Sequence, residues 1–308
     1  IVASIDYHLW ASISRPMYLI TVVFLAALTI AGQALYGSAR WFDTGVILIQ
    51  PSEIAKIVVI LTLADFFTRN KERIGSLGGI ARSLIYTAGV MLPILLQPNL
   101  STSLVILVLW FALLWAGGLK VKHLVMFAMV GIVLPFVAFP FLEDYQQRRI
   151  TNFLSPDPEA SYGETYNLDQ AEIAIGSGGL TGQGFMQGTQ VRGRFLKVRW
   201  SDFIFSVIAQ ELGFVGVMVM LLVLLFVIYR ILRAARLARD TFGGLICYGV
   251  VTLITFQAMV NIGVNLRMIP ATGLTLPFVS YGGSSLLSLL LGVGLVQSVI
   301  LRHRSLEF

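Results

Sequence analysis

Apolar runs of nearly 20 residues recur along this chain, and they decide what it can fold into. A helical run of this length matches the thickness of the hydrocarbon core of a bilayer. Only 12% of the residues are charged, whereas soluble domains carry about 25%. Because helices satisfy their own backbone hydrogen bonds in lipid, the sequence predicts an all-α, polytopic transmembrane helical bundle.

Eight segments have the length and the apolar character expected of its helices. They are about 17–36, 51–67, 80–97, 100–117, 122–142, 203–230, 241–265 and 281–301. The first follows a short mixed stretch that ends at Arg15-Pro16. The third and fourth are joined only by Gln97-Pro98-Asn99, so we expect a tight antiparallel hairpin. We expect residues 1–308 to form a single integral membrane domain with one long loop at 143–200. Residues 269–280 are apolar but interrupted by Pro and Gly, so we expect them to be buried in protein or to line a cavity.

Charge in the short connections predicts the orientation of the chain. If the helices alternate in direction, most basic residues of the short connections fall on one side, which is cytoplasmic by the positive-inside rule. The loop at 143–200 and the turn around Arg40 are then extracytoplasmic. The net charge of +6 does not indicate a nucleic-acid partner, because the basic residues lie in loops between apolar runs.

Asp202 is the last acid before the apolar run 203–230 begins. A carboxylate at a lipid boundary costs free energy unless it is used or neutralised. Alternatively, Ser201 or Asp202 could simply cap the coming helix. Four cations precede Asp202, and they suit either an anionic substrate or the anchoring of lipid headgroups. They are Arg192, Arg194, Lys197 and Arg199.

Two other stretches could carry chemistry, and each has a plainer interpretation. Glu53 and Lys56 lie three residues apart, on one helix face, where they could serve a functional path or only neutralise each other. The glycine-rich stretch 176–184 could approach an anion through its N–H groups or act as a flexible linker.

Other classes of site lack support in the sequence. His8, His123 and His303 are scattered, so we expect no zinc or redox metal site. No Gly-x4-Gly-Lys-Ser/Thr loop occurs, so ATP-driven work is not expected. The residues alone indicate a protein that handles an anionic, lipid-linked molecule at the outer leaflet, and they leave transport and chemistry both open.

A set of motifs follows in a fixed order along the whole chain. They are Ala39-Arg40-Trp41, Gln50-Pro51-Ser52-Glu53 with Lys56, Gln97-Pro98-Asn99-Leu100, 173–179, Gly188-Thr189-Gln190, Asp202–Phe205, Asn261-Ile262-Gly263 and 276–285. This set resembles the SEDS family (shape, elongation, division and sporulation proteins). The blocks at 173–179 and 188–190 resemble its elongation branch, RodA, more than its division branch, FtsW. One departure is at 263–267, where the family's Gly-Met-x-x-Gly reads Gly-Val-Asn-Leu-Arg.

The resemblance implies a fold and an activity. The family has about ten transmembrane helices, so we expect the first and most of the second to lie outside this chain. It implies a peptidoglycan glycosyltransferase in the bacterial inner (plasma) membrane that polymerises lipid II for cell elongation and cell shape, with its active site on the extracytoplasmic side. The implied partners are a class B penicillin-binding protein (a transpeptidase), other membrane proteins of the elongation complex, and membrane lipids.

The resemblance also assigns site residues. It places the catalytic acid on Asp202 and the charged pair of its Gln-Pro-Ser-Glu motif on Glu53 and Lys56. A departing pyrophosphate needs positive charge. The residues expected to bind substrate or pyrophosphate are Arg40, Glu53, Lys56, Arg194, Lys197 and Ser284. No cofactor is certain from the sequence, although a divalent cation, Mg²⁺ or Mn²⁺, could share this role. The alternatives are a lipid II flippase without chemistry, and a scaffold that only positions its partner.

Overall fold

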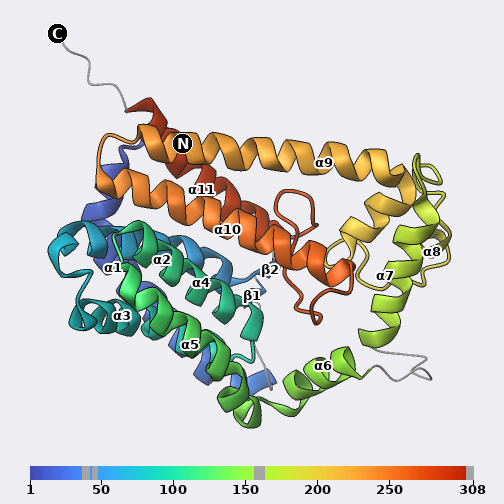
Figure 1. Cartoon of the computed structure of the whole chain (residues 1–308), viewed down its shortest axis with the longest axis horizontal. Coiled ribbons are helices and arrows are strands. Elements are labelled where there is room, and N and C mark those ends of the chain that lie inside the picture. Colours follow the sequence, from blue (N-terminus) through green and yellow to red (C-terminus); the bar gives the residue numbers. More distant parts are fainter. Residues whose placement is uncertain (37–41, 44–47, 156–163, 303–308) are drawn as a thin grey trace. The chain divides into compact units, whose positions relative to one another are not determined.

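The computed structural model of the chain describes residues 1–36, 42–43, 48–155 and 164–302 (Figure 1). Its secondary structure is helical apart from one short antiparallel pair, β1 (Phe42–Asp43) with β2 (Leu48–Ile49). The helices are α1 (Tyr7–Tyr36), α2 (Pro51–Arg69), α3 (Leu77–Leu96), α4 (Leu100–Ala116), α5 (Val121–Ala138), α6 (Asp144–Leu154), α7 (Glu164–Gly178), α8 (Thr189–Arg192), α9 (Ile204–Leu237), α10 (Thr241–Asn265) and α11 (Gly283–Leu301). Short 3-10 turns, η1 (Val2–Ser4), η2 (Lys71–Arg73) and η3 (Phe139–Phe141), complete it.

All eight apolar segments predicted to be helical are helices, which confirms the all-α membrane fold. Within the described chain, six helices are long and apolar enough to cross a membrane, and α4 is apolar but shorter. The apolar sequence of α2 contains the charged residues Glu53, Lys56 and Asp65. The other three helices, α6, α7 and α8, lie in the predicted long loop at 143–200.

The start of α1 was predicted wrongly, about ten residues too late. Pro16 suggested a boundary, yet it lies inside the helix. Proline removes one hydrogen bond from a helix interior, and tertiary contacts near the first turn compensate for this loss. Tyr7 is fully buried and donates a hydrogen bond to Asp240 Oδ2 at 2.9 Å. Ser298 Oγ donates to the carbonyl of Ile5 at 2.6 Å.

The predicted single helix at 203–230 is in fact broken. Gly213 has φ 66° and ψ −166°, a conformation that glycine adopts without a steric penalty. A short segment, 204–212, therefore precedes the long segment, 214–237, and Figure 1 shows the change of direction near the start of α9. An apolar pattern does not reveal this break because it continues through the glycine on both sides.

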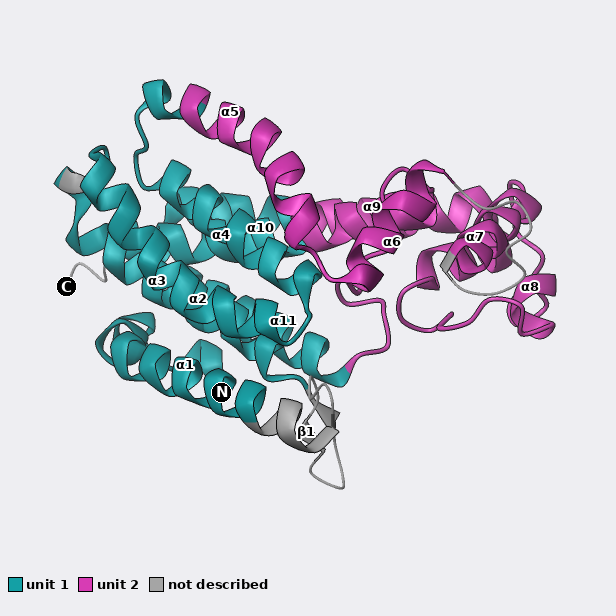
Figure 2. Cartoon of the chain, turned by 90° about the horizontal axis from the view of Figure 1, so that it is seen from below, with its two compact units in different colours: residues 1–124, 228–255, 283–308 teal, residues 125–227, 256–282 magenta. Residues whose placement is uncertain are grey.

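The chain divides into two compact units, which are coloured separately in Figure 2. The first unit comprises 1–124, 228–255 and 283–308, and the second comprises 125–227 and 256–282. The expectation that 1–308 is a single membrane domain stays a prediction.

In the first unit, α2 is the central helix, and it packs against α1, α3, α4 and α11. Most of its residues are buried. The predicted tight hairpin of α3 and α4 is present, and Asn99 caps α4 by accepting from the Thr102 N–H at 3.2 Å. Gln97, at the same turn, donates to Thr29 Oγ1 of α1 at 3.0 Å. The charged residues of α2 are therefore enclosed by neighbouring helices.

The second unit contains most of α5, then α6, α7, α8, α9 as far as Val227, the last turns of α10 and the connection 266–282. Arg267 binds this connection to α7, since its Nη1 lies 2.6 Å from Asp169 Oδ1 and 3.4 Å from Glu172 Oε2. Ser280 binds the other end of the connection to the residues before α9, as Ser280 Oγ donates to the Ser201 carbonyl at 2.6 Å. These contacts enclose the turn that carries Asp202.

Candidate active site

Asp202 lies in a turn immediately before α9, in the second unit. Its Oδ1 accepts a hydrogen bond from Ser201 Oγ at 2.8 Å. Gly273 approaches its other oxygen so closely that a Cβ there would lie 3.7 Å from Oδ2. Burial raises the pKa of Asp202, and the Ser201 hydrogen bond and the charge of Arg149 only partly oppose this shift. Asp202 is thus a carboxylate with enhanced basicity in a largely desolvated position.

The backbone around Asp202 is held by residues of α10 and of the connection that follows. Asn261 Nδ2 and Asn265 Nδ2 both donate to the Asp202 carbonyl, at 3.0 and 2.9 Å. The Tyr281 N–H donates to the Trp200 carbonyl at 2.8 Å. The interpretation of Asp202 as a helix cap is not supported, because the first-turn N–H of Ser206 is taken by Asn265 Oδ1 at 3.2 Å.

Arg149 is a cation of this site that the sequence did not reveal. It lies on α6 and acts electrostatically on Asp202, and its guanidinium carbon stands 5.6 Å from the centre of the Tyr145 ring. Nothing in the sequence marked it, because more than 50 residues separate it from Asp202. Asn261 and Asn265 were likewise given no role. Their signal was present, since two amides four residues apart in an apolar helix point to one interior face.

The four cations before Asp202 are arranged on an open surface. Arg192, Arg194 and Lys197 are exposed, and Arg199 stands over the Trp200 ring at 5.3 Å. No acidic residue occurs from 179 to 200, so the segment is uniformly basic. Arg194 and Lys197 were predicted to bind pyrophosphate, and the structure shows their side chains accessible to an anion in solution or in a headgroup layer.

Glu53 and Lys56 form a buried ion pair in the first unit. Lys56 Nζ lies 2.7 Å from Glu53 Oε2, and the Lys56 side chain is 0% exposed. Ser288 of α11 also approaches Glu53 Oε2, at 3.4 Å. Ser284, one turn earlier, accepts a hydrogen bond from the Gln50 N–H at 2.9 Å. The structure therefore brings the motif that begins α2 together with the serines that begin α11, while Arg40 lies outside the described residues.

The glycine-rich stretch is neither a flexible linker nor an open anion loop. It begins inside α7, and its turn packs against α9 next to the break at Gly213. The N–H groups of Gln183 and Gly184 donate to the carbonyls of Gln210 and Glu211, at 2.9 and 3.0 Å. A Cβ on Gly182 would lie only 2.2 Å from the Glu211 carbonyl oxygen. These glycines therefore permit a close approach of two backbones, and both earlier interpretations were wrong.

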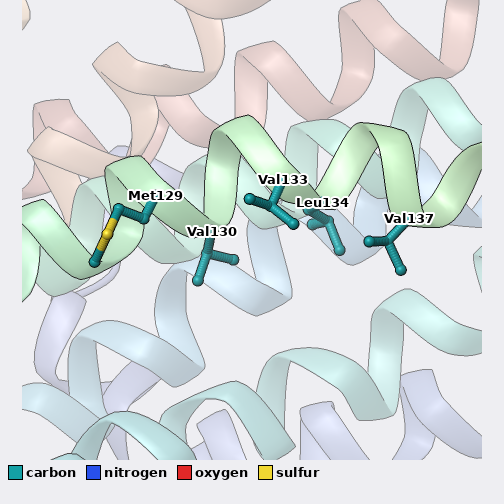
Figure 3. Close-up of a pocket in the computed structure, with 5 residues that line it drawn as sticks. All are labelled: Met129, Val130, Val133, Leu134 and Val137. Atoms are coloured by element: carbon teal, nitrogen blue, oxygen red, sulfur yellow. The ribbon is translucent and has the colours of Figure 1, made fainter.

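A hollow on the surface of α5 is apolar. Figure 3 shows a hollow along α5 that is lined by apolar side chains only: Met129, Val130, Val133, Leu134 and Val137. In the part of the chain that the structure describes, no three His, Cys, Asp or Glu side chains gather as metal ligands. The described residues do not form a metal site of their own, and a divalent cation held with the substrate's phosphates stays a prediction.

Comparisons with known proteins establish the family of this chain. Residues 1–305 match the family model of FtsW, RodA and SpoVE, described as cell cycle protein. The chain is 35% identical to the peptidoglycan glycosyltransferase MrdB of Escherichia coli K12, covering 98% of this chain and 80% of that protein.

Two solved structures show the same fold. One is described as the structural coordination of polymerization and crosslinking by a peptidoglycan synthase complex. It aligns with a TM-score of 0.82 at 30% sequence identity, and the alignment covers 99% of this chain and 85% of that chain. The other is an aspartate-to-alanine mutant of the Thermus thermophilus rod shape determining protein RodA, with a TM-score of 0.71 at 28% identity and coverage of 99% and 83%. The chain therefore belongs to the FtsW/RodA/SpoVE family, the SEDS proteins, as its motifs predicted.

Proposed function

We propose that this chain, a peptidoglycan glycosyltransferase of the SEDS family, polymerises lipid II into glycan strands for cell elongation and cell shape, with Asp202 as the general base. The observation that carries the proposal is the state of Asp202. Its carboxylate is largely desolvated, its pKa is raised, and it accepts a hydrogen bond from the Ser201 hydroxyl group. A base of raised pKa accepts a proton more readily near neutral pH.

The reaction balances with one such base. The 4-hydroxyl oxygen of the acceptor sugar forms a bond to the anomeric carbon of the donor, and the hydroxyl proton passes to the Asp202 carboxylate. The bond between the anomeric carbon and the pyrophosphate oxygen breaks, and undecaprenyl pyrophosphate leaves with the electron pair. An α-linked donor becomes a β-linked product, so the attack inverts the configuration and needs a single carboxylate base on the attacking face.

Negative charge develops on the departing pyrophosphate, and fixed cations stabilise it. Arg149 acts on Asp202 from α6, and the exposed Arg194 and Lys197 precede it in the same unit. Arg40, Lys56 and Ser284 are further candidates for binding substrate or pyrophosphate, and in the proposal Glu53 holds Lys56 in place.

The proposal includes a location and a partner. The charge asymmetry of the short connections supports a bacterial inner-membrane protein with Asp202 on the extracytoplasmic side. The solved complex that this chain resembles couples polymerization to crosslinking, which supports a class B penicillin-binding protein as partner. The elongation role rests on the likeness to RodA and MrdB.

The test is the Asp202→Asn variant, assayed with purified lipid II in detergent micelles. We expect a folded, monodisperse protein that forms no glycan strands, because asparagine keeps the shape of the side chain but accepts no proton. Strand formation at a rate near that of the natural sequence would eliminate Asp202 as the base.

The same assay separates two other functions. A flippase has nothing to do in a micelle, so glycan strands formed there by the natural sequence exclude transport as the only activity. A scaffold would tolerate Asp202→Asn, because the change is nearly isosteric. The buried Glu53–Lys56 pair is the observation that keeps the flippase in view, since intramembrane charges are also typical of transport paths.

A further inference from the structure

The first N–H groups of α9 (Ile204–Leu237), like those of any α-helix, have no partner inside the helix. In an α-helix the N–H of residue i donates to the carbonyl of residue i−4, so the Ser206 N–H would donate to the Asp202 carbonyl if α9 began one residue earlier. In this chain the Ser206 N–H donates instead to Asn265 Oδ1, at 3.2 Å. The Asp202 carbonyl accepts from Asn265 Nδ2, at 2.9 Å. A single side-chain amide from α10 thus stands between the two groups that would otherwise bind each other.

The orientation of this amide is fixed by its other partners. Asn265 Oδ1 also accepts from Ser206 Oγ at 2.6 Å, and Asn265 Nδ2 also donates to the Asn261 carbonyl at 2.8 Å. A reversed amide would lose its bonds to the Ser206 N–H and to the Asp202 and Asn261 carbonyls, and only the Ser206 hydroxyl could still pair with it. Asn265 is 1% exposed, and water does not compete for these groups.

We propose that Asn265 is a positioning residue, which keeps Asp202 outside α9 by inserting its amide into the helical bond between Ser206 and Asp202. This inference rests on the proposed role of Asp202 as the base. If the helix extended back through residue 202, the carboxylate would turn by about 100° per added residue around the helix axis. It would then leave Ser201 and the backbone of Gly273, which flank it in the structure.

The alternative bonding is available as soon as the amide is removed. In an Asn265→Ala variant, the Ser206 N–H and the Asp202 carbonyl both lose their partner at Asn265. A buried N–H without a partner is costly, and the direct bond between them satisfies both groups by adding one residue to the start of α9. Asn261 still donates to the Asp202 carbonyl, but it offers nothing to the Ser206 N–H.

The first experiment compares Asn265→Ala with Gln257→Ala in the lipid II polymerisation assay. Gln257 lies two turns away on α10 and is equally buried, and neither its amide oxygen nor its nitrogen has a partner among the described residues. Displacement of a reacting group by about 1 Å can cost about 100-fold in rate. We expect Asn265→Ala to lower kcat by about that factor while KM changes by less than about threefold. Gln257→Ala should keep kcat within about threefold.

A second-site change tests the cause of the loss. Proline at position 206 has no N–H, and its ring occupies the place that the Asp202 carbonyl would take in an extended helix. Proline is tolerated in the first turn of a helix. We therefore expect the double variant Asn265→Ala with Ser206→Pro to regain at least about tenfold in kcat over Asn265→Ala alone, although it lacks still more of the native hydrogen bonds.

The outcomes are separable from those of the proposed function. If Asp202→Asn forms strands normally, the role of Asp202 as the base fails, and this inference fails with it. If Asp202→Asn is inactive but Asn265→Ala keeps a normal kcat, only the positioning role is wrong. If folded Asn265→Ala is inactive and Ser206→Pro restores nothing, helix extension is wrong as the cause. Should Asn265→Ala not fold, Ser206→Pro alone decides: retained activity supports the inference, and loss of kcat in a folded protein overturns it.

Discussion

The Glu53–Lys56 pair allows a stability effect to be separated from a functional one. Both side chains are buried, the Lys56 side chain is 0% exposed, and the two charged groups are 2.7 Å apart. Removing one partner of such a pair leaves an uncompensated charge and costs about 3–5 kcal/mol, whereas replacing both is often nearly neutral. We therefore expect Glu53→Gln to destabilise the protein by about 3–5 kcal/mol.

Thermal unfolding in detergent measures this change. At roughly 2 °C per kcal/mol for a chain of this size, Glu53→Gln should lower the Tm by roughly 6–10 °C. The double variant Glu53→Gln with Lys56→Met should recover most of this loss. A matched control is Arg69→Gln on the same helix. Its partner Asp65 is also 2.7 Å away, but the Arg69 side chain is 52% exposed, so we expect about 1 kcal/mol or less.

The activity of the double variant then decides what the pair is for. In the proposed function, Lys56 binds the leaving pyrophosphate, so the double variant should be stable and yet form no glycan strands from lipid II. If the double variant is stable and polymerises normally, the pair only neutralises two buried charges. If Glu53→Gln alone melts at the temperature of the natural sequence, the argument from burial is itself refuted.

Three further predictions follow from the structure. Because burial raises the pKa of Asp202, polymerisation should fall on acidification through a pKa above the ordinary value of about 3.9. The stability that this group contributes should be lost in the opposite direction, as pH rises through the same pKa. Initial rates and melting curves measured against pH test the two expectations. Gly182→Ala should prevent stable folding, since the φ of Gly182 is +81° and a Cβ there would lie 2.2 Å from the Glu211 carbonyl oxygen. The control Gly176→Ala should instead stabilise α7 by about 1 kcal/mol, because a Cβ there would have nothing within 4 Å. Arg267→Gly should change the free energy of unfolding by less than about 1 kcal/mol, because relief of a left-handed backbone (φ 53°) offsets the loss of partly exposed ion pairs.

Much of the fold could be predicted because the bilayer imposes the helix length. Eight apolar runs gave eight helices, and Gln97-Pro98-Asn99 was short enough to require a hairpin. The pairing of Glu53 with Lys56 also followed, because a spacing of three places both on one helix face. These features depend on sequence neighbours alone, and periodicity is a reliable guide to them.

The predictions that failed concern features that depend on residues far away in the chain. Pro16 suggested a boundary because Asp240, which supports the first turn through Tyr7, is more than 220 residues distant. Arg149 carried no signal because nothing near it in the sequence marks it as a neighbour of Asp202. The glycines at 176–184 resembled a linker because the carbonyls that they approach belong to α9, about 30 residues later.

Asn265 is a third case. Its sequence position indicated a buried, hydrogen-bonded amide, but it did not indicate which group the amide binds. Amides are costly inside an apolar helix unless they are hydrogen bonded, so Asn261 and Asn265 had to face partners in the protein. Their spacing of four residues placed both amides on one side of α10. What the sequence could not supply was the identity of the partner, since a backbone carbonyl has no sequence signature. In this chain the two amides bind backbone groups at the start of α9, and the residue just before that start, Asp202, is the first candidate for a functional side chain.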